Sequence, residues 1–149
     1  MRLDLHGMRT RDAIDRFIYE YNRTVGAGGE RMEVVHGYGS SGVGGDIKGA
    51  LCALLDAHAS KVRYIKGESL GNKGITVVIP DGALPSRQYA LDPVVGSVLS
   101  IKPVSVAAIE QKLSGLATAD EIQRSLAGLV SNGKATKVIQ TGRLLYAKK

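Results

Sequence analysis

This chain of 149 residues contains a single cysteine, Cys52. A single thiol excludes intrachain disulfides and cysteine-rich zinc sites. No apolar run approaches the roughly 18 residues that a membrane-spanning helix needs. The chain leads into a strand at Leu3 without the pattern of a signal peptide. We therefore expect a globular protein in a reduced, cytoplasmic setting, with no membrane partner.

Acidic residues are missing from the last part of the chain. The net charge is +6, and residues 122–149 hold six basic side chains and no acidic one. Such a segment is typical of a protein that binds a polyanion, although a tail kept soluble by lysines fits the charge equally well. If the segment binds nucleic acid, we expect Arg124, Lys137 and Arg143 to contact it.

Hydrophobic periodicity predicts a two-layer α/β unit over residues 1–80, in the order β-α-β-α-β-β. The expected strands are 2–6, 32–36, 61–66 and 74–79. The first helix begins near Thr10 and ends at Gly26–Gly29, and the second begins at Asp46. Each helical connection is long enough for a right-handed crossover, so the first two strands should be parallel.

Residues 81–90 are expected to form a linker, and residues 91–149 a second, smaller unit. Periodicity predicts helices at 93–101 and 104–113, and Thr118 with Glu121 forms the pattern of a capping box before a third helix. Residues 136–140 and 144–147 should form a hairpin. Three helices followed by a hairpin is the order of a winged-helix α+β unit. A helical hairpin that packs against the first unit is the alternative.

Two of the three histidines lie in similar motifs, each at the end of a predicted strand. The motifs are Leu3–Gly7 and the glycine-rich segment Val34–Gly45. If the strands are parallel neighbours, both imidazoles meet the glycine-rich loop at the sheet edge where ligands bind in open α/β sheets. Glycine exposes the backbone N–H groups at the start of a helix to phosphate.

Asp4, His6 and His36 are the candidate catalytic residues. Histidine transfers protons near neutral pH, and Asp4 could orient His6 or act as a base itself. The first-unit residues expected to contact nucleic acid are Gly37, Tyr38, Gly39, Ser40, Ser41, Gly42 and Lys48, with the Tyr38 ring placed to stack on an unpaired base. The structural alternatives are a plain glycine turn, a helix-capping Asp4 and a packed His36.

No cluster of carboxylates with metal-ligand spacing occurs in the sequence, so we expect no metal site and no tightly bound cofactor. Mg²⁺ recruited together with the phosphate of a substrate stays open as an alternative.

Three motifs together resemble the Smr domain, the small MutS-related domain. They are L-D-L-H-G in the first strand, V-V-H-G-Y-G-x-x-G in the second, and G-x-x-G-I-T-V-V-I before and in the last. They occur in the family's order and at its usual distances, and the resemblance covers about residues 1–80. It implies a fold similar to the C-terminal domain of bacterial translation initiation factor 3. It also implies nucleic-acid binding, with endonuclease activity on DNA or RNA in several members.

The resemblance assigns family positions to individual residues. Asp4 and His6 match the acid and histidine of the first motif, His36–Gly39 match the H-G-x-G loop, and Gly71 and Gly74 match the late glycine motif. One departure lies in the loop, which has an extra serine at Ser40–Ser41. Gly44–Asp46 stand where the family has Leu-Arg, and Lys48, one turn further on, could replace that arginine.

We therefore expect a stand-alone Smr protein that binds nucleic acid and hydrolyses phosphodiester bonds in structured DNA or RNA. A non-catalytic module that binds nucleic acid or the ribosome is the alternative.

Overall fold

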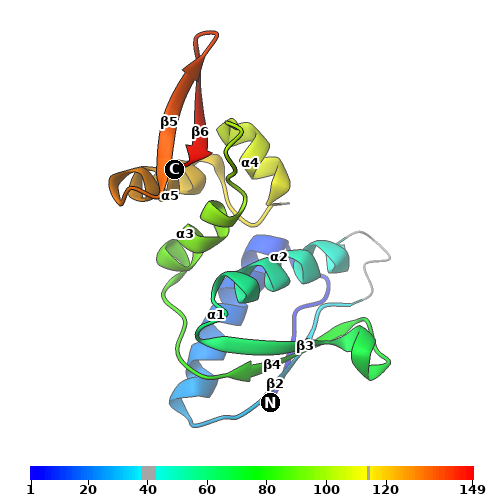
Figure 1. The fold of residues 1–149 in the computed structure, drawn as a ribbon. Coiled ribbons are helices and arrows are strands. Elements are labelled where there is room, and N and C mark those ends of the chain that lie inside the picture. The colour runs from blue at the N-terminus through cyan, green and yellow to red at the C-terminus, as the bar shows by residue number, and fades with distance from the viewer. Residues whose placement is uncertain (38–42, 114) are drawn as a thin grey trace. The chain divides into compact units, whose positions relative to one another are not determined.

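The computed structural model describes residues 1–37, 43–113 and 115–149. The chain divides into two compact units, Met1–Ser86 and Arg87–Lys149, each with its own helices, strands and buried core (Figure 1). Among the described residues, no helix combines the length and the apolar character that crossing a membrane requires.

The first unit has the predicted order of helices and strands. In chain order its elements are β1 (Arg2–Asp4), α1 (Thr10–Gly26), β2 (Met32–Val35), α2 (Val43–Ala57), β3 (Val62–Lys66), the 3-10 helix η1 (Gly67–Leu70) and β4 (Ile75–Pro80). The expected start of the second helix at Asp46 is wrong by one turn, because the helix runs through Gly44 and Gly45 from Val43.

The four strands form one mixed sheet in the order β1-β2-β4-β3. β1 and β2 are parallel, as predicted, and β4 is antiparallel to both of its neighbours. Helices α1 and α2 contact each other and lie on one face of the sheet (Figure 1). The largest fully buried side chains between the layers include Leu5, Ile14, Phe17, Tyr21, Met32, Ile47, Leu51, Leu54 and Leu55. Their burial fixes which strand residues face the helices.

The second unit consists of three helices followed by a two-stranded antiparallel hairpin. Its elements are α3 (Arg87–Ser97), α4 (Val106–Lys112), α5 (Ala119–Ser131), β5 (Ala135–Gln140) and β6 (Arg143–Lys148). The capping box predicted at Thr118 and Glu121 is present at the start of α5. Thr141 and Gly142 both have positive φ, 48° and 74°, which is the backbone of a type I′ turn and matches the twist of a two-residue hairpin.

The prediction for the first helix of this unit is wrong. It placed the helix at 93–101, whereas α3 begins at Arg87, inside the expected linker, and contains Pro93. The buried residues Ala90, Leu91, Val94 and Val95 continue one helical face on both sides of the proline. Packing of that face offsets the one backbone hydrogen bond that an internal proline removes.

Candidate nucleic-acid interface

The two histidine motifs come together at one edge of the first sheet. β1 and β2 pair with Asp4 opposite Val35, and the Leu5 N–H donates to the Val35 carbonyl at 2.7 Å. A Cβ placed on Gly37 would lie 3.4 Å from the Cβ of His6. Gly37 therefore lies directly against His6, and its φ of 83° is a conformation that glycine adopts readily.

Asp4 and His6 form an exposed hydrogen-bonded pair. The Asp4 Oδ1 atom accepts from the backbone N–H of His6 at 3.1 Å and from His6 Nδ1 at 2.6 Å. Because a carboxylate only accepts, Nδ1 carries the hydrogen and Nε2 is the other nitrogen. The side chains are 55 % (Asp4) and 67 % (His6) exposed, so this pair can meet a ligand from solvent.

The same hydrogen bonds keep Asp4 charged. They lower the pKa of the Asp4 carboxyl below its usual value of 3.8, with the side chain of His6 as the first cause and its backbone N–H as the second. Asp4 is therefore an anion across the physiological pH range and can hold the imidazole in one orientation.

His36 does not join this pair, contrary to the sequence-based expectation. Thr76 lies opposite Val34 in the sheet, and both are fully buried. The His36 ring bonds to Thr76 and is itself 0 % exposed. Side chains alternate between the faces of a strand, so Asp4 and Val35 share one face while Val34 and His36 share the other. The two histidines follow the ends of adjacent strands, and their side chains lie on opposite faces of the sheet.

Both ring nitrogens of His36 have partners. Nδ1 lies 3.1 Å from the Gly37 carbonyl, which can only accept, and Nε2 lies 3.0 Å from Oγ1 of Thr76. Nδ1 is therefore the donor, and a neutral Nε2 accepts from the threonine hydroxyl. Burial lowers the pKa of His36, with the bond to the Gly37 carbonyl acting in the opposite direction. His36 is therefore a neutral residue whose ring joins the backbone at Gly37 to Thr76 of β4.

Gly74 provides a second anchor for the start of the loop. Its carbonyl accepts from the N–H of His36 at 3.0 Å and from the N–H of Gly37 at 3.1 Å. The Gly37 amide, which we expected to face phosphate, is therefore engaged within the sheet. The late glycine motif forms this anchor, because Gly71 ends η1 at φ 80° and Asn72 Oδ1 accepts from the Gly74 N–H at 3.0 Å.

Lys48, the expected phosphate contact at the start of α2, is paired with Glu68. Its Nζ lies 2.5 Å from Glu68 Oε1, and this bond lowers the pKa of Glu68. Both charges act on the pKa of His36, Lys48 lowering it and Glu68 raising it. Both members of the ion pair therefore act electrostatically on His36, and Glu68 adds a negative charge beside the lysine.

Arg9 is a site candidate that the sequence analysis missed. It is the N-cap residue of α1, is exposed, and makes no side-chain capping bond. It follows His6 by three residues, at the positive end of the helix dipole. A basic residue in the place of a capping Ser or Asp is the pattern that could have revealed it.

The other residues predicted to contact nucleic acid fall into two groups. Tyr38, Gly39, Ser40, Ser41 and Gly42 lie outside the described residues. Arg124 on α5, Lys137 on β5 and Arg143 on β6 are exposed and belong to the second unit. Within the described part of the chain, no group of three His, Cys, Asp or Glu side chains is arranged to hold a metal ion.

Comparison with known proteins identifies the family through a family model. Searches of curated proteins and of solved structures give no match. The model of the Smr domain matches residues 3–80, which is more than half of the chain and includes all three motifs. Smr domains are in general nucleic-acid-binding and related to endonucleases. The chain therefore belongs to the Smr domain family.

Proposed function

We propose that this protein is an endonuclease that cleaves phosphodiester bonds in structured DNA or RNA, with Asp4 and His6 as its catalytic pair. The observation that carries the proposal is the 2.6 Å bond between Asp4 Oδ1 and His6 Nδ1. It fixes the imidazole so that Nε2 is the atom available for proton transfer, beside the start of the glycine-rich loop. An aspartate that orients a histidine in this way is a recurring arrangement in hydrolytic sites.

In the proposed reaction, His6 Nε2 removes the proton from the attacking oxygen, which belongs to water or to a 2′-hydroxyl group. That oxygen forms a bond to phosphorus, and the bond from phosphorus to the leaving oxygen breaks. The leaving oxygen takes a proton from the His6 imidazolium or from water. Asp4 stabilises the imidazolium while it is charged, and Mg²⁺ recruited with the substrate would neutralise phosphate charge.

The backbone and the basic residues around His6 would bind the phosphate. Arg9 begins α1 at its positive end and follows His6 by three residues, and residues 38–42 follow Gly37, which lies against His6. His36 has a positioning role in this scheme, because both of its nitrogens are engaged and it is fully buried. The predicted role of His36 in proton transfer is not part of the proposal.

We further propose that the second unit is a winged-helix-like unit that adds a nucleic-acid surface, and that the first resembles the C-terminal domain of translation initiation factor 3. The order α3-α4-α5-β5-β6 supports the first idea. So does a bridge between Val104 and Tyr146, which adds a short third segment to the hairpin. Arg124, Lys137 and Arg143 would contact the phosphate backbone.

The test is incubation of the purified protein with supercoiled plasmid and with structured RNA, with and without Mg²⁺. We expect cleavage by the wild type and none by an Asp4→Ala/His6→Ala double variant that retains its circular dichroism spectrum. Both side chains are exposed, so their removal should leave the fold intact. Equal integrity of the substrates with both proteins would refute the catalytic assignment.

A non-catalytic module that binds nucleic acid or the ribosome is the second candidate. The ion pair between Lys48 and Glu68 favours it, since it neutralises the lysine that was expected to contact phosphate. In this case the protein would bind nucleic acid with an affinity that falls steeply with salt. Neither the wild type nor the Asp4→Ala/His6→Ala variant would cleave it. Fluorescence anisotropy over a range of salt concentrations, beside the cleavage assay, separates the two functions.

A further inference from the structure

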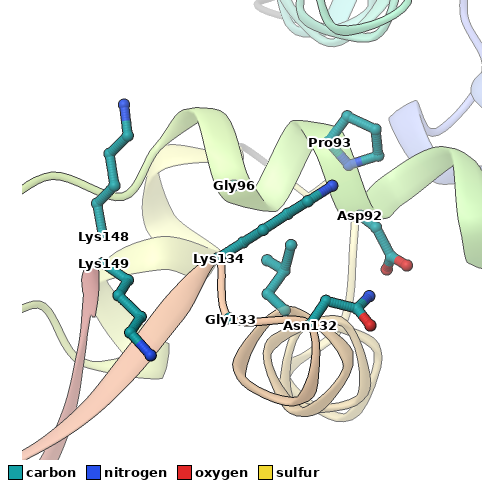
Figure 2. Close-up of a pocket in the computed structure, with 9 residues that line it drawn as sticks. Asp92, Pro93, Gly96, Asn132, Gly133, Lys134, Lys148 and Lys149 are labelled. Atoms are coloured by element: carbon teal, nitrogen blue, oxygen red, sulfur yellow. The ribbon is translucent and has the colours of Figure 1, made fainter.

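A pocket of about 490 Å³ lies within the second unit. It is formed by α3, by the turn after α5 and by the ends of the hairpin strands. Figure 2 shows Lys134 extending across it toward Pro93 and Asp92, while the side chains of Lys148 and Lys149 diverge from the end of β6. Its volume is within the range of pockets that hold small organic ligands.

The rim of this pocket carries a concentration of positive charge. Lys134, Lys148 and Lys149 line it, and a neighbouring pocket shares Lys148 and Lys149 and adds Lys102. The backbone holds these segments together, because the Lys148 N–H donates to the Ser100 carbonyl at 2.8 Å and the Lys149 N–H to the Lys134 carbonyl at 3.3 Å. Three lysines from two segments of the chain therefore line the pocket, and a fourth, Lys102, lines the neighbouring one.

The lining includes a single acid, Asp92. Its Oδ1 accepts from the Ser125 hydroxyl at 2.6 Å, so the carboxylate is tied to α5. Three lysines against one carboxylate leave an excess of positive charge, which suits a ligand with at least one phosphate group.

The inner surface of the pocket is apolar. Pro93 and Gly96 of α3 and Leu129 of α5 line it, and a Cβ placed on Gly96 would meet both terminal methyl groups of Leu129 at 3.9 Å. Asn132, at the edge, has an amide that can both donate and accept. An apolar surface suits the face of an aromatic base, and an amide suits its polar edge.

The exposed side of α5 lacks such a concentration of charge. The exposed residues of α5 on that side are Asp120, Gln123, Arg124, Ala127 and Ser131, so one cation is accompanied by one anion and by uncharged side chains. Within the described part of the second unit, the lysine-rimmed pocket is a better phosphate-binding surface than the outer face of this helix.

We propose that this pocket binds one nucleotide unit, with its phosphate at the lysines and its base against Leu129. The unit is supplied by a single-stranded segment of nucleic acid or by a free mononucleotide, which share this chemistry. The inference rests on the proposed function only where a nucleic-acid strand supplies the nucleotide. It concerns residues of the second unit and involves no step of cleavage.

The sharpest test fills the pocket without changing its charge. A Gly96→Leu substitution keeps all four lysines, makes only ordinary contact at its Cβ, and places further carbon atoms in the cavity. Gly128→Leu is the matched control, because nothing lies within 4 Å of a Cβ at that α5 position and Gly128 does not line the pocket. A second pair compares Lys134→Ala with Lys112→Ala, an exposed lysine of α4 outside the pocket.

Binding of the full chain to adenosine monophosphate and to a short single-stranded oligoadenylate is measured by calorimetry and anisotropy. We expect Gly96→Leu and Lys134→Ala to weaken binding by about tenfold or more, and the two controls to bind as the wild type does. Binding of the mononucleotide identifies the free ligand as a source, and binding of the strand alone identifies nucleic acid.

Two results would overturn the proposal. One is that neither probe binds. The other is that Gly96→Leu binds as the wild type does while Lys134→Ala binds weakly, which would mean that the ligand contacts the lysines at the surface and does not enter the pocket. The proposed function fails separately. An Asp4→Ala/His6→Ala variant that still binds the probes, beside a wild type that cleaves no substrate, would refute catalysis and leave the pocket intact.

Discussion

His6 and His36 occupy equivalent positions in two similar motifs, yet their surroundings are opposite. His6 is 67 % exposed in its side chain and is held by a charged aspartate. His36 is 0 % exposed and is held by a threonine hydroxyl and a backbone carbonyl. The difference comes from the alternation of side chains between the two faces of the sheet. Asp4 lies opposite Val35, so the side chain of His36, one residue further on, is directed to the other face. Similar motifs therefore place one histidine at the surface and the other in the core.

The largest expected effect separates these roles by single substitutions. His6→Ala should lower the rate of cleavage by roughly 10²–10⁴-fold, the usual contribution of a general base, with no measurable change in stability. His36→Ala should lower the free energy of unfolding by about 2–4 kcal/mol, because it leaves a cavity and removes the partner of a buried hydroxyl.

Cleavage rates and urea denaturation of both variants provide the check. The comparison fails if His36→Ala is as stable as the wild type, or if His6→Ala loses stability and keeps its activity. A variant at His58, the third histidine, is a control for the general effect of losing an imidazole.

The next effect is a pH dependence of stability that belongs to His36. Its pKa is below 6.5 in the folded chain because of burial, so as the pH falls through 6.5 the unfolded chain binds a proton that the folded chain does not. Stability from neutral His36 is thus complete above pH 6.5 and declines below it, by at most about 1.4 kcal/mol per pH unit.

The free energy of unfolding of the wild type and of His36→Ala is measured from about pH 7.5 to about pH 5, a range that spans the ordinary histidine pKa of roughly 6.5. The difference between the two proteins should shrink toward acid. Contributions of other titrating groups are common to both and cancel in that difference. A constant difference over the range would mean that His36 is not held neutral by the fold.

The smallest effect concerns the charge beside the loop. Glu68→Gln frees Lys48 and removes a carboxylate, so affinity for nucleic acid should rise by about two- to fivefold at low salt, the scale of an exposed ion pair, and less at high salt. Glu110→Gln, which removes the same charge from an exposed position on α4, is the control. An equal gain from both variants would show an effect of net charge only.

Much of the fold could be predicted from the sequence because long periodic segments specify it. The apolar stripe of α1, the capping box of α5 and the turn at Thr141–Gly142 each depend on local chemistry that the sequence displays. The start of α3 could not be predicted in this way. Pro93 is typical of a helix start, and only the packing of Ala90 and Leu91 extends the helix back to Arg87.

The candidate site was predictable in its composition but not in its geometry. Asp4 and His6 are two residues apart, so local alternation was enough to bring them together. Whether Val35 or His36 lies beside Asp4 depends on the register between β1 and β2, which no local pattern specifies. The partner of Lys48 depends on η1, a short element without a periodic pattern.

The Gly74 carbonyl accepts hydrogen bonds from the amides of both His36 and Gly37, and it is synthesised after both of them. The amides of His36 and Gly37 are held by Gly74, directly before β4, which follows them by nearly forty residues in the chain. Because synthesis runs from the N-terminus and distant contacts form late, a nascent chain that ends before residue 74 already carries His6 and His36 but lacks the carbonyl that bonds the His36 and Gly37 amides. A chain that ends before Gly74 therefore lacks the contact that holds the backbone of His36 and Gly37 in the candidate site.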